Sequence, residues 1–207
     1  MNDDVRGRDL KRLVAGASER SAELAAGLGA VADERGLLDI AIGTVDTPLG
    51  RLSVAVTARG LLEVSFPEYD RDEWLGALAV RVSPRILELP EKTDDVRRQL
   101  GEYFEGTRTT FDLRLDRRLL RGFQRETLTE AQRIPYGGTS TYGELAERIG
   151  SPRAARAIGN ALGANPIPIV IPCHRVLRTG GALGGYGGGT PRKQRLLELE
   201  RKVSRDR

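Results

Sequence analysis

Hydrophobic residues change their spacing along the first part of the chain. Between residues 9 and 34 they recur every three or four positions, which predicts an amphipathic helix appended to the rest of the protein. From residue 37 onward they alternate with other residues, first in residues 40–42 and again in residues 52–56. The turn-forming segment Thr47-Pro48-Leu49-Gly50 separates these two alternating runs and predicts a β-hairpin between them.

A third strand and two helices are predicted after the hairpin. Residues 61–66 form a short, mostly apolar run after Gly60, which predicts a strand. Residues 71–82 and 94–104 return to the helical spacing. Residues 37–118 are therefore predicted to form a small antiparallel sheet with helices, so that the expected fold class is α+β.

The second half of the chain has a helical pattern, and residues 141–163 predict two helices joined by a tight turn. Thr141 and Glu144 have the spacing of a capping box, so a helix is expected to begin there. Gly150 can end this helix, and Pro152 suits the first turn of the next one. This arrangement is typical of a DNA-binding helix-turn-helix, but it also describes two helices that simply pack together.

Charge is distributed unevenly between the two halves. The 207 residues carry a formal net charge of +4, with 39% hydrophobic and 30% charged residues. Residues 121–207 hold 15 Lys and Arg against 7 Asp and Glu, a balance of +8, which leaves −4 for residues 1–120. A basic half suggests a polyanionic partner, although a solvated charged surface would give the same count. The expected organisation is an appended helix of unknown role in residues 1–36, an α/β domain in residues 37–118 and a mainly helical domain in residues 119–207.

The composition excludes several classes of protein. No uninterrupted apolar run approaches the ~20 residues that a membrane span needs, and the N-terminal residues lack the apolar segment of a signal peptide. A single Cys and a single His exclude an intramolecular disulfide, a multi-cysteine zinc site and a multi-histidine metal centre. We therefore expect a cytoplasmic protein without a metal ion or another cofactor.

The only Cys and the only His are adjacent, and they follow a rigid segment. Pro166 and Pro168 stiffen the approach, and an apolar run then leads through Pro172 to Cys173 and His174. A Cys beside an imidazole at the start of a helix has its thiolate form favoured, which would make Cys173 a nucleophile. The alternative is a buried, inert thiol next to a histidine with an ordinary structural hydrogen bond.

The second helix of the predicted pair has a face of small residues beside two arginines. Ala154, Ala155 and Ala157 lie close in the sequence to Arg153 and Arg156. Small side chains allow another backbone to come near, and arginine supplies a charge with a planar set of donors. Close packing against another helix would explain the same small residues.

Several motifs in the second half resemble, in their order and spacing, those of the O6-alkylguanine-DNA alkyltransferases, also called methylated-DNA–protein-cysteine methyltransferases. The matching segments lie roughly within residues 119–200 and are Thr141-Tyr142-Gly143-Glu144-Leu145-Ala146, Ser151-Pro152-Arg153-Ala154-Ala155-Arg156-Ala157-Ile158-Gly159, Asn165-Pro166, Ile171-Pro172-Cys173-His174-Arg175-Val176, Gly184-Gly185-Tyr186-Gly187-Gly188-Gly189, Lys193 and Leu196-Leu197-Glu198-Leu199-Glu200. The hairpin at residues 47–50 resembles the N-terminal domain of this family more loosely, and residues 1–36 have no counterpart. The resemblance implies a ribonuclease H-like N-terminal domain and a winged-helix-like C-terminal domain.

The resemblance also implies direct repair of DNA, in which the alkyl group of O6-alkylguanine, and of O4-alkylthymine, moves irreversibly to Cys173. His174 would accept the thiol proton through a water molecule, and Glu200 would orient His174. Asn165 would hold the active-site turn, and Tyr142 would donate a proton or a hydrogen bond toward the departing guanine. Because the thioether product is a very poor leaving group, each protein molecule is expected to react once.

The same resemblance assigns the contacts with DNA. The second helix would lie in the minor groove, with Arg156 entering the base stack while the damaged nucleotide is flipped out of the duplex. The residues expected at the DNA are Arg153, Ala154, Ala155, Arg156, Ala157 and Gly159. The expected partner is therefore double-stranded DNA that contains O6-alkylguanine, bound by a protein that is a monomer in solution, with cooperative binding to DNA left open.

The substrate pocket implied by the resemblance is lined by Tyr142, Pro168, Val176, Tyr186 and Gly187. The family usually has Ser or another residue where this chain has Gly187, which keeps a backbone N–H but puts a side-chain contact in doubt. The glycine-rich residues 184–189 also raise the hypothesis of a roomy pocket that accepts alkyl groups larger than methyl.

Three other functions compete with alkyl transfer. A non-reactive protein that only recognises alkylated DNA is the principal alternative, but its known representatives replace the acceptor cysteine, whereas Cys173 is present. A cysteine hydrolase would leave the basic half without a purpose. A helix-turn-helix regulator would leave Cys173, His174 and Glu200 unexplained. We therefore expect direct alkyl transfer.

Overall fold

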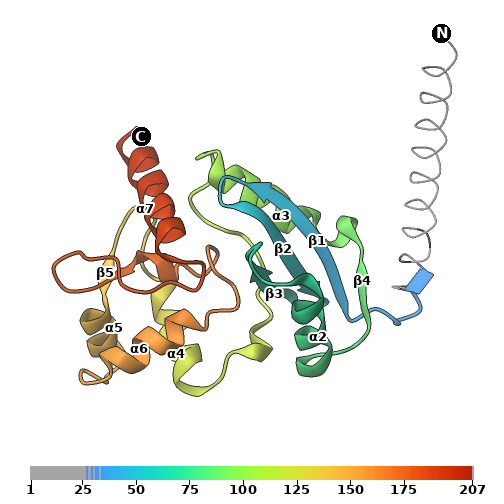
Figure 1. Cartoon of the computed structure of the whole chain (residues 1–207), viewed down its shortest axis with the longest axis horizontal. Helices are drawn as coiled ribbons and strands as arrows, with labels where there is room; N and C mark the ends of the chain where they lie inside the picture. Colours follow the sequence, from blue (N-terminus) through green and yellow to red (C-terminus); the bar gives the residue numbers. More distant parts are fainter. Residues whose placement is uncertain (1–26, 28, 30, 33, 207) are drawn as a thin grey trace, which may run out of the picture.

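The computed structural model describes residues 27, 29, 31, 32 and 34–206 (Figure 1). Most of the helix predicted for residues 9–34 therefore lies outside the described residues, and its role stays untested. Among the described residues, no helix is both long enough and apolar enough to span a membrane. The four-stranded sheet lies toward one end of the molecule, and the helices of residues 122–205 lie toward the other (Figure 1).

The N-terminal half contains a four-stranded sheet in the order β3-β2-β1-β4. Its strands are β1 (Ile40–Thr47), β2 (Gly50–Thr57), β3 (Gly60–Ser65) and β4 (Ile86–Glu88). The predicted hairpin is present, with Thr47 opposite Gly50 in the register of β1 and β2. The three predicted strands are antiparallel as expected, but the sheet also has a fourth strand, β4, which was not predicted and runs parallel to β1. A three-residue strand is too short to show an alternating pattern, which is why the sequence did not reveal it.

Both faces of this sheet are covered by helices. Helix α2 (Arg71–Arg81) packs Trp74 and Leu78 on one face, against Ile40, Ile42, Ala55 and Leu62. Helix α3 (Pro90–Phe104) packs on the other face of the sheet. The strand residues that point toward α3 alternate along each strand with those that point toward α2, because successive strand side chains point to opposite sides. Asp70 caps the N-terminus of α2. Its carboxylate accepts hydrogen bonds from the backbone N–H groups of Asp72 and Glu73, which have no acceptor within the helix.

The C-terminal half is mainly helical, as predicted. Its helices are α4 (Gly122–Ala131), α5 (Tyr142–Arg148), α6 (Ala155–Gly163) and α7 (Thr190–Arg205), together with the short 3₁₀ helices η1 (Arg117–Leu119) and η2 (Cys173–Arg175) and the parallel pair β5 (Ser140–Thr141) and β6 (Val176–Leu177). The capping box at Thr141 and Glu144 is present with both of its hydrogen bonds. Helix α6 begins three residues later than predicted, because the backbone N–H of Ala154 donates to the carbonyl of Ser151 and closes a turn first.

One hydrophobic core runs through both halves. It joins residues of β2 and β3, such as Leu52 and Val64, to residues of the C-terminal half, such as Ile171 and Leu196. The backbone N–H of Val64 also donates to the carbonyl of Pro166 at 2.8 Å, so that the edge of the sheet is bonded to the segment that leads to Cys173. The two halves therefore position the candidate site together.

Gly60, at the start of β3, is closely packed against the backbone of Arg114, in the segment that leads toward the C-terminal half. It has φ +123°, and an added Cβ would lie 2.1 Å from the carbonyl oxygen of Arg114. We expect Gly60→Ala to lower the free energy of unfolding by about 2 kcal/mol, measured by urea denaturation. Gly76→Ala is the matched control within α2, where an added Cβ meets nothing within 4 Å, and it should raise stability by about 0.5–1 kcal/mol. Equal effects of the two substitutions would contradict this account.

Candidate active site

The segment before Cys173 is held by the side chain of Asn165. The Asn165 amide donates to the carbonyl of Ile171 at 3.0 Å and to the Sγ of Cys173 at 3.1 Å, while its oxygen accepts from the N–H of Ile167 at 3.0 Å. Within this turn, Ile169 is fully buried with φ +74°, a conformation that a β-branched residue rarely adopts. One polar side chain therefore ties together both ends of a strained turn and contacts the sulfur.

Cys173 is buried and stands at the first residue of η2. The predicted advantage of a helix start for the thiolate is absent, because a three-residue 3₁₀ helix has almost no aligned backbone dipoles. Burial raises the pKa of Cys173 to about 11, although the hydrogen bond from Asn165 and the charge of Lys193 oppose this shift. The sequence-based expectation of a favoured thiolate in the free protein is therefore wrong.

His174 and Glu200 form a buried pair. Nε2 of His174 lies 2.8 Å from Oε1 of Glu200, and both side chains are almost fully inaccessible. Burial lowers the pKa of His174, and the hydrogen bond to Glu200 opposes this. Burial alone would raise the pKa of Glu200, but hydrogen bonds from His174 and Arg175 outweigh it and hold the pKa at about 2. Nδ1 of His174 is buried and makes no hydrogen bond within the described part of the chain, so it is the ring atom left for a proton.

Glu200 has further partners that the sequence did not reveal. Arg175 donates from Nε and Nη2 at 2.9 Å each, the Tyr103 hydroxyl donates at 2.7 Å, and the Gly137 N–H donates at 3.1 Å. Arg175 directly follows His174 and could have been noticed for its position. Tyr103 lies on α3, 97 residues from Glu200, and nothing in the sequence points to it.

Tyr142 and Lys193 meet on the other side of the site. The Tyr142 hydroxyl lies 3.5 Å from the carbonyl of Gly185, and the Lys193 ammonium lies 5.8 Å from the centre of the Tyr142 ring. Lys193 is fully buried and donates to the carbonyl of Val176 at 2.5 Å and to that of Gly185 at 3.3 Å. From the sequence, Lys193 is noticeable only as part of a motif. In the structure, its two hydrogen bonds hold β6 and the glycine-rich loop together.

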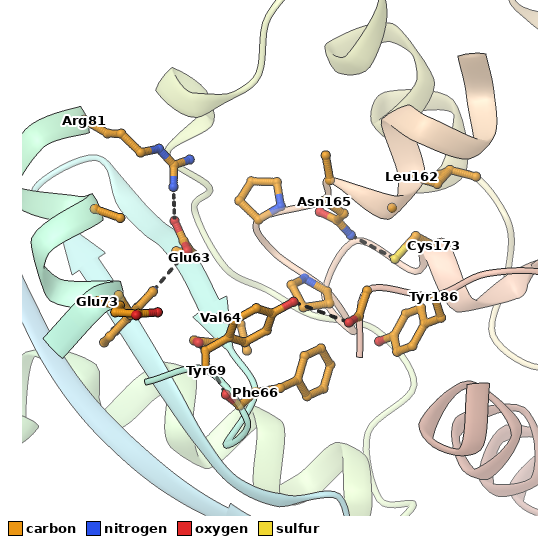
Figure 2. A pocket seen from close by; sticks show the side chains of 18 of the residues that line it. Glu63, Val64, Phe66, Tyr69, Glu73, Arg81, Leu162, Asn165, Cys173 and Tyr186 are labelled. Carbon is orange, nitrogen blue, oxygen red and sulfur yellow. Dashed lines mark hydrogen bonds and ion pairs between the residues drawn. The ribbon is translucent and has the colours of Figure 1, made fainter. Parts of the chain in front are cut away.

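Two hollows meet at Tyr186 and Gly187. The first is a cavity of about 380 Å³ between the two halves, and it is lined on its C-terminal side by Cys173, Asn165 and Pro168, among others (Figure 2). The second, of about 840 Å³, runs along α6 and is lined on that side by Ala155, Arg156 and Gly159, together with Tyr142. Of the predicted pocket residues, only Val176 lines neither hollow; its side chain is buried in the core, and its role is expected for the backbone.

The predicted DNA-facing residues lie on the exposed face of α6 and the turn before it. Arg153, Ala155, Arg156 and Ala157 are exposed, Ala154 and Gly159 are partly so, and the buried face of the helix consists of Ile158, Ala161 and Leu162. Close packing of one helix against another therefore does not explain Ala155 and Ala157.

Within the residues that the structure describes, no group of three or more His, Cys, Asp or Glu side chains could hold a metal ion.

Comparison with known proteins covers most of the described chain. The family model of the 6-O-methylguanine DNA methyltransferase ribonuclease-like domain matches residues 40–117, and that of the DNA binding domain matches residues 122–202. A methylated-DNA–protein-cysteine methyltransferase of Mycolicibacterium paratuberculosis is 46% identical over 168 residues, which cover 78% of this chain and 92% of the relative. The constitutive enzyme of that name from Bacillus subtilis is 36% identical over 159 residues, covering 76% and 93% respectively.

Solved structures agree with these matches. The structure of Mycobacterium tuberculosis OGT in complex with DNA is 41% identical, with a TM-score of 0.68, and the match covers 79% of this chain and 94% of that one. Both the α+β architecture and the family resemblance are therefore confirmed, and the chain belongs to the methylated-DNA–protein-cysteine methyltransferase family.

Proposed function

We propose that this protein repairs DNA by moving the alkyl group of O6-alkylguanine to the sulfur of Cys173. The proposal is supported by Cys173, which lines a cavity, whose sulfur lies 3.1 Å from the Asn165 amide, and which is followed in the chain by the His174 of the buried His174–Glu200 pair. A purely structural cysteine would need neither the cavity nor a neighbouring imidazole with an unbonded nitrogen.

The reaction exchanges one bond for another. The sulfur of Cys173 forms a bond with the alkyl carbon as the bond from that carbon to O6 breaks, and the electron pair of the broken bond stays on guanine. The thiol proton passes through a bridging water to Nδ1 of His174, and Glu200 stabilises the resulting imidazolium. Guanine gains a proton from the Tyr142 hydroxyl, so that it is released from the alkyl group as a neutral base. The Tyr142 phenolate then regains a proton through water as the His174 imidazolium loses the one taken from the thiol, and the protein product is a thioether. O4-alkylthymine can react in the same way.

Deprotonation in step with attack suits a buried thiol. Because its pKa lies at about 11, very little Cys173 is ionised at neutral pH. A free thiolate would also react with other electrophiles, whereas a protonated thiol is much less reactive until a base takes the proton. The protein is therefore selective for the bound alkylated base over other electrophiles. It is consumed by a single reaction, because the described site contains no second nucleophile that could remove the alkyl group from Cys173.

The exposed face of α6 is proposed to enter the minor groove. Arg156 lies beside the second hollow, and Tyr142, Tyr186 and Gly187 form the part of that hollow nearest the site. Arg156 would replace the flipped nucleotide in the base stack, and Arg153 would contact phosphates. Binding is then independent of sequence and weakens with salt, because phosphate contacts release counterions. We propose that a monomer acts in this way on double-stranded DNA in the cytoplasm.

The decisive experiment measures transfer itself. After incubation with a duplex that contains one O6-methylguanine, mass spectrometry should find one added methyl group on the peptide containing Cys173, with no more than one transfer per protein molecule. Cys173→Ser should bind the duplex and remain unmodified. An unmodified Cys173 in a wild-type protein that binds the lesion tightly would instead establish the non-reactive alternative.

The pH dependence of thiol alkylation tests the buried state of Cys173. Since the pKa of Cys173 is raised to about 11, its rate of reaction with iodoacetamide should keep rising with pH through pH 9, with no plateau below about pH 10. In urea the same thiol should level off near its ordinary pKa of about 8.5. A plateau between pH 6 and 8 in the folded protein would mean that the thiolate is favoured after all.

Arg156→Ala separates nucleotide flipping from chemistry. We expect methyl transfer from duplex DNA to slow by at least about tenfold, equivalent to about 1.4 kcal/mol, because the flipped state loses the side chain that fills the stack. Transfer from the free base O6-benzylguanine should change less than twofold. Arg201→Ala removes the same charge from α7 and serves as the control. Equal losses on both substrates would show that Arg156 acts elsewhere in the reaction.

A further inference from the structure

Tyr103 is the one described donor to Glu200 that comes from the N-terminal half. It lies on α3, whereas Glu200 lies on α7, so their hydrogen bond crosses from one half of the protein to the other (Figure 1). Both side chains are fully buried. The Tyr103 hydroxyl donates to Oε1 of Glu200 at 2.7 Å, and the same oxygen lies 2.8 Å from Nε2 of His174. A residue of the N-terminal half therefore shares the acceptor atom of the ring that follows Cys173.

The position of the Tyr103 ring is fixed by its neighbours. Three rings pack against it, with 5.3, 5.4 and 5.8 Å between ring centres: Phe104, Phe111 and Tyr136. Gln99 holds the segment of Phe111 against α3, because its side-chain amide donates to the carbonyl of Asp112 at 2.9 Å and accepts from the N–H of that residue at 2.8 Å. The hydroxyl of Tyr103 is thus aimed at Glu200 by the packing of the N-terminal half.

Tyr103 and Glu200 keep their ionisation states over the pH range in which His174 titrates. Burial and the charge of Glu200 raise the pKa of Tyr103 well above its ordinary value, and the pKa of Glu200 is held at about 2. Burial also raises the pKa of the neighbouring Cys173 to about 11. Between about pH 4 and pH 9 the hydroxyl of Tyr103 is therefore always a donor and Glu200 is always a carboxylate.

The other groups around His174 act in opposite directions on its pKa. Burial lowers this pKa, and the positive charges of Arg175 in η2 and Lys193 on α7 lower it further, whereas Glu200 raises it. The Tyr186 ring stands edge-on to the imidazole, with 6.4 Å between ring centres, and burial keeps its hydroxyl protonated by raising the pKa of Tyr186. Because Arg175 already neutralises the carboxylate, a proton on His174 leaves the buried cluster with a net positive charge.

We propose that Tyr103 is a positioning residue for the transfer reaction, which keeps His174 neutral by donating to the Glu200 oxygen that His174 also uses. The positive end of the O–H dipole points at Oε1, and it therefore also opposes a proton that arrives on the neighbouring ring. Nδ1 of His174 consequently stays free to accept the proton of the Cys173 thiol, and it gives this proton up again after the sulfur has reacted. The inference deepens the proposed alkyl transfer and rests on it.

This arrangement suits a base that must accept a proton near neutral pH. A general base is most effective when its pKa lies near the working pH, because it must be unprotonated before the reaction and still bind the proton during it. A carboxylate shared by fewer donors would hold His174 as an imidazolium, which has no free nitrogen for the thiol proton. The N-terminal half thereby adjusts a base that belongs to the other half.

The titration of His174 tests this role directly. His174 is the only histidine of the chain, so nitrogen-15 labelling of histidine in the full chain, made without a histidine tag, gives ring signals from this residue alone. In Tyr103→Phe, which keeps the ring and removes the donor, the ratio of protonated to neutral His174 at a given pH should rise at least about threefold.

Thr127→Val is the matched control for the titration. It also removes one fully buried hydroxyl, but this hydroxyl donates to the carbonyl of Phe123 at 2.8 Å and not to Glu200. The ratio of protonated to neutral His174 should therefore equal that of the wild type. Urea denaturation of both variants shows how much stability each hydroxyl contributes, so that a general loss of stability is separated from a change at His174.

The pH dependence of methyl transfer provides the second readout. In single-turnover assays on an O6-methylguanine duplex, the acid side of the rate profile should move to higher pH in Tyr103→Phe, by the same amount as the His174 titration. At pH 8.5, where the ring is neutral in both proteins, the variant should react within about twofold of the wild-type rate. A merely structural role of Tyr103 would instead lower the rate by one factor at every pH.

The failure of this inference differs from the failure of the proposed function. If the wild type transfers methyl but His174 titrates no higher in Tyr103→Phe than in the wild type, Tyr103 does not adjust the base and the inference is overturned. A wild-type protein that transfers no methyl group overturns the proposed function, and the role of Tyr103 in transfer with it. Matching upward shifts of the titration and of the rate profile, absent in Thr127→Val, support the inference.

Discussion

The buried carboxylate of Glu200 holds together groups from distant parts of the chain. A buried charge is costly unless opposite charges and hydrogen bonds satisfy it, and here His174, Arg175, Tyr103 and the N–H of Gly137 do so together. These partners come from η2, from α3 of the N-terminal half and from the loop after α4. The hydrogen bonds to this one carboxylate therefore hold three distant parts of the chain together. They also orient the ring of His174, the residue that follows Cys173.

Burial also keeps Cys173, the proposed nucleophile, protonated. Cys173 is surrounded by the core, and its few favourable contacts, from Asn165 and Lys193, do not outweigh the loss of solvent. A folded protein that reacts once benefits from an unreactive thiol, because an exposed thiolate would be lost to other electrophiles. Reactivity is then a property of the complex with its substrate, in which position and proton transfer are provided together.

The two halves have separate tasks that meet at Tyr186 and Gly187. The hollow along α6 is lined by exposed small residues and Arg156, which we propose contact DNA, and the cavity on the other side extends toward α2. The N-terminal half therefore supports Glu200 through Tyr103 and also shapes the site, even though the nucleophile and the helix proposed to bind DNA belong to the other half.

The family, the hairpin, the capping box of α5 and the adjacency of Cys173 to His174 can all be read from the amino-acid sequence, because they depend on local spacing. The sequence did not reveal β4, because a three-residue strand is too short to show an alternating pattern. It also placed the start of α6 too early, because that start depends on the hydrogen bond from the N–H of Ala154 to the carbonyl of Ser151. It also predicted a favoured thiolate, since adjacency to His174 is visible in a sequence and burial is not. Tyr103 and the interdomain cavity arise only when residues far apart in the chain pack together, so the tertiary structure alone decided the ionisation of Cys173 and the space around it.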